Sequence, residues 1–366
     1  MTAARPHPLF AALEPSGLMI GSALPADLPP PSTPTAAPDA PLGDDGLPLF
    51  HEWALMTAPQ IAGLPRDRTV IMVTASPLEV HGPHLPTITD ICEAEGLGVR
   101  MMRRLRALHP EMVFVRLPPI YVASDVLPHV GSLHFRPSTI RAVYEDLGRS
   151  LCKQGFRHVW VGGFHGGPRH FVPVEQACDA VNRRHGARML SIFGMLLNQL
   201  TGGDTDLADI LGSCEGIEAQ QLRGDAHGGA IETSMMLALL GRHVDPMHKR
   251  LGHNDVHLAR ARTGKASVEL KGRPSPPELV RLLLAKLRYY EEETWSGDPS
   301  LATPELGEQF LDVLAGHAAG ALSKVWTGQI PITETKSPAW KMRHLFSSAI
   351  VGALLPRVLG SKSPVF

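Results

Sequence analysis

From about residue 50 onward, short apolar runs rich in β-branched residues alternate with longer stretches that carry apolar residues at helical spacing. The short runs are typical of strands buried on both faces, and the longer stretches are typical of amphipathic helices. Strands are expected at 70–74, 112–117, 158–162 and 188–193, and helices at 91–108, 138–153 and 170–184. This alternation predicts an α/β fold with a mostly parallel sheet covered by helices on both faces, in three α/β/α layers.

The two ends of the chain differ from this middle part. Residues 1–48 are rich in proline and alanine, a composition that favours an extended arm over packed structure. After a helix that starts near Glu232, helical spacing returns at 279–293, 306–325 and 344–355, the first of these following a proline-rich helix start at 274–278. We expect an N-terminal extension, 1–48, and one domain, 49–366, with additional helices from about 274. These helices either pack on the sheet, cover a site as a lid or make subunit contacts.

Candidate chemistry begins shortly after the first predicted strand. Glu79, His81, His84 and Asp90 place four possible metal ligands within twelve residues. In open parallel sheets ligands gather at the carboxyl ends of strands, so these side chains are positioned for chemistry. Carboxylate oxygen and imidazole nitrogen suit zinc, manganese or iron(II).

Two later segments supply further candidates. His165 follows the strand expected at 158–162 and is flanked by glycines, which allow close backbone approach. Glu232 lies where a glycine-rich loop runs into an apolar helix, and His227 lies within that loop. Because separate segments each deliver such residues, a shared metal site is favoured over unrelated surface groups.

Together these segments resemble the creatininase family of metal-dependent amidohydrolases. The resemblance lies in Glu-Val-His-Gly-Pro-His-Leu-Pro at 79–86 with Asp90 close behind, in His-Gly-Gly at 165–167, and in His-Gly-Gly at 227–229 followed by Glu-Thr-Ser at 232–234. It covers roughly residues 50–245, with a fainter match at 117–124 that is similar to a substrate-side loop of the family. Three ordered segments are more specific than any one of them.

The resemblance implies a dinuclear metal site. Glu79, Asp90 and His165 would bind one divalent ion, and His81, Asp90 and Glu232 the other, with Asp90 bridging. The two ions, zinc, manganese or iron, would activate a water molecule that attacks the carbonyl carbon of an amide. His227 matches the catalytic histidine of the family and would carry a proton from this water to the leaving nitrogen.

Several positions depart from the family pattern. Val80 stands where glutamine is usual, and Gly163 and Pro168 stand where asparagines are usual. These changes alter hydrogen bonding around the metal ligands and the polarity of the pocket. Gly167 stands where creatinine-hydrolysing members carry a metal-binding glutamate, so the resemblance assigns this role to Glu232.

The position of the tryptophans bears on the substrate. Creatinine hydrolases use tryptophans between the second and third segments to enclose a flat ring, but here none of the five tryptophans falls between His165 and His227. A small amide other than creatinine, either a cyclic amide or a formamide, is therefore the expected substrate. The alternatives are a metallopeptidase-like hydrolase of a short peptide and a non-catalytic, metal-stabilised binding or assembly protein.

Structural roles remain open for some of these residues. Asp90 could simply cap the helix that follows it. His84, held in a turn between two prolines, is expected to fix its loop. Asp225 either orients the nearby histidine or is an ordinary loop acid, and Ser124 and Asp125 either touch substrate or serve as turn residues.

The composition limits the kinds of molecule that the protein is expected to bind. The 366 residues carry a formal net charge of −1, which leaves no basic field for nucleic acid or for an anionic membrane, so a small neutral substrate is expected. The four cysteines form no Cys-x-x-Cys pair, and the N-terminus lacks the pattern of a secretory signal, so the cytoplasm is the expected location. Members of the resembled family commonly form hexamers from dimers, which implies a homo-oligomer, with a hexamer as one form.

Overall fold

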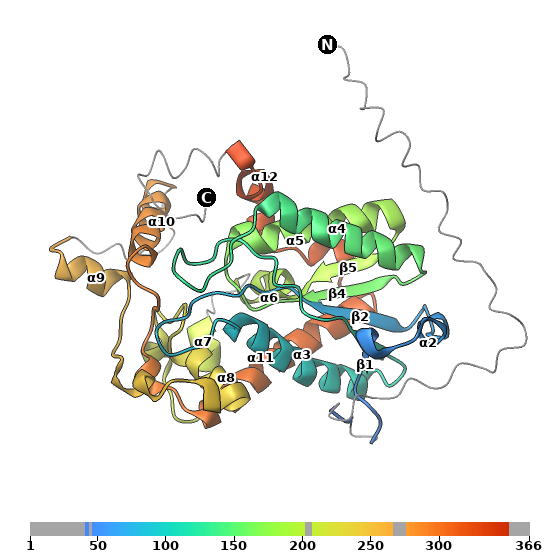
Figure 1. Cartoon of the computed structure of the whole chain (residues 1–366), viewed down its shortest axis with the longest axis horizontal. Coiled ribbons are helices and arrows are strands. Elements are labelled where there is room, and N and C mark those ends of the chain that lie inside the picture. Colours follow the sequence, from blue (N-terminus) through green and yellow to red (C-terminus); the bar gives the residue numbers. More distant parts are fainter. Residues whose placement is uncertain (1–40, 44–45, 202–206, 266–275, 351–366) are drawn as a thin grey trace, which may run out of the picture.

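The computed structural model describes residues 41–43, 46–201, 207–265 and 276–350, and within them five strands form one sheet (Figure 1). The strands are β1 (His51–Glu52), β2 (Thr69–Thr74), β3 (Val113–Arg116), β4 (His158–Gly162) and β5 (Arg188–Ser191). Their order across the sheet is β1-β3-β2-β4-β5, and each neighbouring pair is parallel. The predicted parallel sheet is confirmed.

The order in which the chain adds strands to the sheet reverses beside β2. From β2 the chain adds β3 on one side, and it then returns to place β4 on the other side before it continues to β5. In this arrangement Val70 of β2 pairs with Phe114 of β3 and with His158 of β4. A reversal of this kind opens a crevice beyond the carboxyl ends of the two central strands, where open α/β sheets bind ligands.

Helices cover both faces of the sheet. On one face lie α3 (Thr89–Leu108), α6 (Ile192–Thr201) and α11 (Pro304–Trp326), and on the other lie α4 (Pro137–Lys153) and α5 (Pro168–His185). The six residues of β2 are all buried, because Val70 and Met72 pack toward the first set of helices while Ile71 and Val73 pack toward the second. The three-layer α/β/α architecture is therefore confirmed.

The other helices surround this core. They are α2 (Ala58–Ala62), α7 (Leu207–Leu211), α8 (Ala230–Leu240), α9 (Val256–Arg262), α10 (Pro276–Tyr290) and α12 (Arg343–Phe346), joined by loops and short 3-10 helices. Buried side chains of α8 pack against α11, and Figure 1 shows α9 and α10 at the end of the molecule away from β1. No helix in the described part of the chain is both long and apolar enough to span a membrane.

Some predicted boundaries differ from the structure. The strand expected at 188–193 ends at Ser191, because α6 begins at Ile192, and a continuous apolar run does not reveal where strand turns into helix. The helix expected at 344–355 is the single turn α12, and residues 351–355 lie outside the described residues. Most of the expected extension 1–48 also lies outside them.

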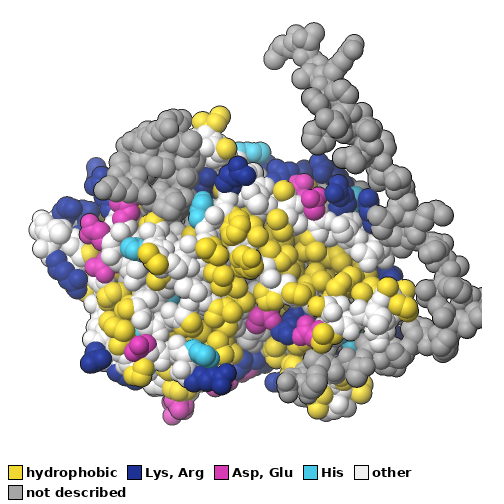
Figure 2. Space-filling view, in the orientation of Figure 1, with side chains coloured by type: hydrophobic (Ala, Val, Ile, Leu, Met, Phe, Trp, Pro, Cys, Tyr) yellow, Lys and Arg dark blue, Asp and Glu magenta, His cyan; other side chains and the backbone are white. Residues whose placement is uncertain are grey.

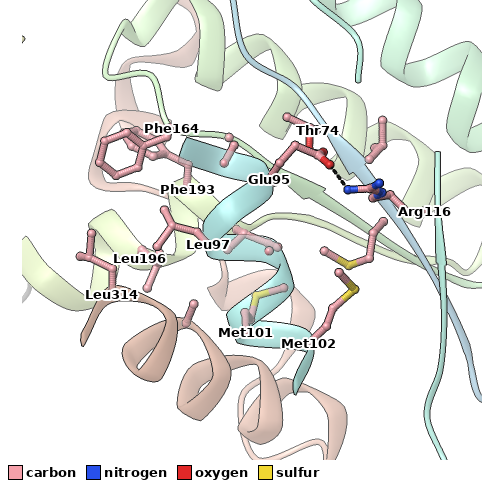
Figure 3. A pocket seen from close by; sticks show the side chains of 18 of the residues that line it. Thr74, Glu95, Leu97, Met101, Met102, Arg116, Phe164, Phe193, Leu196 and Leu314 are labelled. Carbon is pink, nitrogen blue, oxygen red and sulfur yellow. Dashed lines mark hydrogen bonds and ion pairs between the residues drawn. The ribbon is translucent and has the colours of Figure 1, made fainter. Parts of the chain in front are cut away.

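An apolar cavity of about 480 Å³ lies between the sheet and helices α3, α6 and α11 (Figure 3). Apolar side chains such as Met101, Phe164 and Leu314 line it, and an ion pair between Glu95 and Arg116 lies at one end. Its lining contains none of the residues predicted to bind metal or to catalyse. The cavity is therefore a feature of the core and separate from the predicted site.

We expect Gly98→Ala to raise the free energy of unfolding by about 1 kcal/mol, because glycine inside a helix is costly in conformational entropy. Gly98 lies in α3 on the wall of the cavity, and an added Cβ would meet no atom within 4 Å. Gly96→Ala is a matched control on the same helix, since its Cβ would lie 2.7 Å from the Leu239 side chain and should forfeit the gain. Denaturant unfolding of both variants measures the difference, and a Gly98→Ala protein no more stable than wild type would contradict the prediction.

Candidate metal centre

The five predicted metal ligands meet beyond the carboxyl ends of β2 and β4. Glu79 and His81 lie in the loop after β2, and His165 follows β4. Asp90 is the second residue of α3, and Glu232 is the third residue of α8. All five side chains are buried. The structure thus brings together residues that are up to about 150 positions apart in the sequence.

Asp90 lies between the two histidines. One of its oxygens is 3.5 Å from Nε2 of His81, and the other is 3.9 Å from Nδ1 of His165. Oε2 of Glu79 is 3.0 Å from the same nitrogen of His165, and Oε2 of Glu232 is 3.7 Å from Nε2 of His81. The ligand atoms within each of two groups, Glu79–Asp90–His165 and His81–Asp90–Glu232, lie within 4.8 Å of one another. These are the two ligand sets that the resemblance implies.

Backbone carbonyls orient both histidines. Nδ1 of His81 donates to the carbonyl oxygen of Glu79 at 3.0 Å, and Nε2 of His165 donates to the carbonyl oxygen of Ser124 at 3.0 Å. Because a carbonyl oxygen only accepts, these nitrogens carry the proton in the neutral rings, and the other nitrogen of each ring faces the carboxylates. Histidines that bind metals are held in this way.

Several atoms of this cluster lack hydrogen-bond partners. Oε2 of Glu79, Nε2 of His81 and Oδ2 of Asp90 are buried without one. Nearly all buried polar atoms in proteins are paired, and an unpaired buried charge is costly. Divalent cations would satisfy these atoms, so the residues fit a metal site.

The pKa values of three members of the cluster agree with a site that favours positive charge, whereas burial raises the pKa values of Asp90 and Glu232. Burial by itself would lower the pKa of His81, but the carboxylates of Asp90 and Glu232 raise it to about 10. Burial is likewise outweighed at His165, whose pKa Glu79 and Asp90 raise to about 9. Burial would raise the pKa of Glu79, but the neighbouring histidines lower it to about 2. The carboxylates therefore stabilise positive charge at the positions where cations would bind.

His227 lies beside the metal ligands. Its ring stacks on that of His81, with centroids 4.0 Å apart, and its Nε2 donates to the carbonyl oxygen of Val80 at 2.7 Å. Burial, followed by the positive charge of His81, lowers the pKa of His227 to about 3, so the ring is neutral and its Nδ1 has a free lone pair. His227 also forms a third group with Glu79 and His81 whose ligand atoms lie within 4.8 Å of one another. Its geometry suits either proton transfer or metal binding.

Gly167 has no room for a side chain. An added Cβ would lie 2.4 Å from Cβ of Asp125 and 2.7 Å from the ring of His165. A glutamate at this position could not be accommodated without moving both neighbours. The carboxylate of Glu232 lies near His81 instead, with Oε2 3.7 Å from Nε2 of that histidine.

The structure shows the contacts of three residues whose roles the sequence left undecided. Asp90 does not cap α3, since the helix begins at Thr89 and the Asp90 side chain belongs to the cluster. Asp225 accepts a hydrogen bond from the backbone N–H of Ala230, so it caps the start of α8. Nε2 of His84 lies 2.8 Å from Oγ1 of Thr233, which ties the loop after β2 to α8.

The stretch 117–124, similar to the substrate-side loop of the family, continues into residues 125–127, and this loop contacts the cluster through its backbone. The N–H of Leu127 donates to Oε1 of Glu79 at 2.6 Å, and the carbonyl of Ser124 holds His165. Asp125 has a φ of +60° and accepts a hydrogen bond from the N–H of Arg169 at the start of α5. This loop therefore orients ligands from both central strands.

A segment near residue 295 also contacts the site, although no sequence pattern indicates it. The backbone of Ser296 pairs with that of His227 in both directions, at 2.7 and 3.3 Å, and the carbonyl of Thr294 accepts from the N–H of Gly82 at 2.7 Å. Tyr290 lies against His227. Glycine and proline at 297–299 mark a turn in the sequence, but nothing local indicates which loop the turn would contact.

The chain is similar to several known proteins. A mycofactocin precursor peptide peptidase from Mycobacterium ulcerans is 29% identical over 206 residues, which cover 55% of this chain and 67% of that protein. A solved structure of creatininase with manganese is 18% identical, with a TM-score of 0.48, and covers 75% of this chain and 98% of its own. A putative creatinine amidohydrolase from Bacteroides fragilis is 17% identical, with a TM-score of 0.49, and covers 75% and 96%.

The sequence model of the creatininase family, described as creatinine amidohydrolase, matches residues 54–322. The match continues well past residue 245, where the resemblance in the sequence ends, and it includes α10 and most of α11. It also spans far more than half of the chain. The chain therefore belongs to the creatininase family and is a metal-dependent hydrolase that acts on carbon–nitrogen bonds.

Proposed function

We propose that the protein hydrolyses an amide bond with two divalent metal ions. The ligands in this proposal are Glu79, His81, Asp90, His165 and Glu232. The observation that carries it is the position of Asp90, whose two oxygens face different histidines at 3.5 and 3.9 Å. A carboxylate placed in this way is suited to bridge two ions, and its partners complete a ligand set on each side.

When bound, the two ions would polarise the amide carbonyl and lower the pKa of a water molecule, so that hydroxide is available near neutral pH. The protein residues provide orientation and charge. Glu79, Asp90 and Glu232 offset most but not all of the charge of two divalent ions, which leaves a site that favours an anionic tetrahedral species. The carbonyls that hold His81 and His165 fix the ring orientations that ion binding requires.

His227 is the proposed proton carrier. Its Nε2 is held by the carbonyl of Val80, and its Nδ1 remains able to accept a proton and to donate it again to the leaving nitrogen. Stacking on His81 keeps the ring beside the metal ligands. The same position would also let it bind a metal, and metal analysis of a variant separates these roles, as discussed below.

The proposed substrate is a small amide, either cyclic or a formamide. The lack of tryptophan between His165 and His227 argues against creatinine itself. A short peptide is the second candidate, and the name of the Mycobacterium ulcerans relative, a precursor peptide peptidase, favours it. Both substrate classes present the same scissile group to the metal centre.

Purified protein should contain roughly two divalent ions per chain, and a chelator should abolish hydrolysis that added zinc, manganese or iron(II) then restores. Metal analysis followed by assays on a lactam, an N-formyl amino acid and a dipeptide tests the proposal in one preparation. Hydrolysis that survives complete metal removal would contradict it. Metal-loaded protein that is inert toward all three classes would contradict the proposed substrate classes.

Self-association remains a prediction. Figure 2 shows hydrophobic side chains gathered in the centre of one face, with many of the charged side chains around them. Apolar surfaces of this kind often mark contacts with other proteins. Light scattering on the purified protein distinguishes a monomer from the homo-oligomer, or hexamer, that we propose.

A further inference from the structure

Tyr290, the last residue of α10, lies against the proposed proton carrier. Its ring meets that of His227 edge to face, with centroids 6.0 Å apart and an interplanar angle of 77°. The sequence left the role of α10 open, and this contact shows that the helix reaches the metal centre. Tyr290 therefore supplies an aromatic side chain beside His227.

Two loops fix the position of Tyr290. Its carbonyl oxygen accepts a hydrogen bond from Nε2 of His129 at 2.9 Å. The loop that carries His129 also donates the N–H of Leu127 to Glu79 at 2.6 Å. Tyr290 is thus held between the loop that orients Glu79 and the loop that carries His227, on the border of the site.

The Tyr290 hydroxyl makes no hydrogen bond to any of the described residues. The hydroxyl of nearby Ser296 donates its single proton to the carbonyl of Gly224 at 2.9 Å. The phenolic oxygen of Tyr290 therefore keeps its lone pairs free for a donor from the substrate. Burial raises the pKa of Tyr290 well above its ordinary value, so the group stays neutral.

We propose that Tyr290 is a substrate-binding residue whose hydroxyl oxygen accepts a hydrogen bond from the N–H of the scissile amide, while its ring forms a wall beside His227. This inference rests on the proposed function and names its substrate class as secondary amides. A tertiary amide has no N–H to offer, and its extra substituent would approach the Tyr290 oxygen. Secondary amides should therefore be preferred over their N-methyl counterparts.

The test combines a hydroxyl deletion with matched substrates. Wild type, Tyr290→Phe and the control Tyr289→Phe are assayed on glycylglycine against glycylsarcosine, N-formylglycine against N-formylsarcosine, and pyrrolidinone against N-methylpyrrolidinone. In the class that wild type hydrolyses, Tyr290→Phe should lower kcat/KM for the secondary amide by roughly 10-fold to 100-fold and change little for the tertiary amide. Its metal content should equal that of wild type.

Tyr289 is the adjacent tyrosine, and its hydroxyl donates to the carbonyl of Trp295, remote from substrate in this proposal. Tyr289→Phe should keep kcat/KM within about twofold of wild type. Unchanged kcat/KM in Tyr290→Phe, or equal losses on the secondary and tertiary amides, would overturn the role of Tyr290 and leave the proposed function intact. A wild type without metal-dependent amide hydrolysis would instead overturn both.

Discussion

Asp90→Ala should strip the protein of its metal ions and lower kcat/KM by a factor on the order of 10⁴ or more, since water is not activated without them. Asp90 belongs to both ligand groups, so its loss leaves two ligands in each. Metal analysis and kinetics on the same sample measure the two effects together. A third readout is thermal: a chelator should lower the Tm of wild type and leave that of Asp90→Ala unchanged, because ions stabilise only a protein that binds them.

Glu93→Gln is the matched control for this variant. Glu93 lies three positions further along α3 and is as deeply buried as Asp90, but it belongs to none of the ligand groups among the described residues. Burial, together with the charges of Glu232 and Asp90, raises the pKa of Glu93 well above its usual value, so the neutral amide is a close mimic. Glu93→Gln should retain metal and activity. An Asp90→Ala protein that kept its ions would refute the bridging role.

His227→Ala should keep its full metal content and lose kcat by about 10³-fold, because it removes the proton carrier and leaves the five ligands in place. Exogenous imidazole should restore part of the rate, since a small base can occupy the space left by the ring. Rate measurements with and without imidazole, next to metal analysis, check both statements.

His227 also belongs to a possible ligand group with Glu79 and His81. A loss of metal from His227→Ala would therefore be informative as well. If His227→Ala loses one ion per chain together with its activity, His227 is a ligand and the proton carrier lies elsewhere. If the variant turns over at the wild-type rate, neither role holds. The retention of metal with loss of turnover is the only result that supports the proposed assignment.

Local patterns in the sequence predicted the layers of the fold and the residue types of the site. The apolar run of β2 has no polar face because its alternate residues pack on helices at opposite faces of the sheet. Glu79, His81 and Asp90 follow that strand within a short stretch. The predicted strand was therefore almost enough by itself to predict that these three residues lie close together. The boundary between β5 and α6 was not predictable, since one apolar run continues through both.

Contacts between distant segments were predictable only where the family resemblance supplied them. Glu232 was assigned by resemblance, whereas the caps and pairings around it, such as Asp225 on Ala230, were left open. Tyr290 escaped notice altogether, because a tyrosine at the end of a helix is ordinary and its neighbour His227 lies more than sixty positions away.

The amino-acid sequence by itself therefore determined the parallel sheet, the helices on its two faces and the carboxylate and imidazole groups placed after its central strands. These features depend on burial patterns and turn residues that act over a few positions. Only the tertiary structure decided that Asp90 lies between two histidines, that Gly167 has no room for a side chain, and that Tyr290 borders the site. Those facts depend on how helices and loops dock, which is the sum of many weak packing contacts that no single segment encodes.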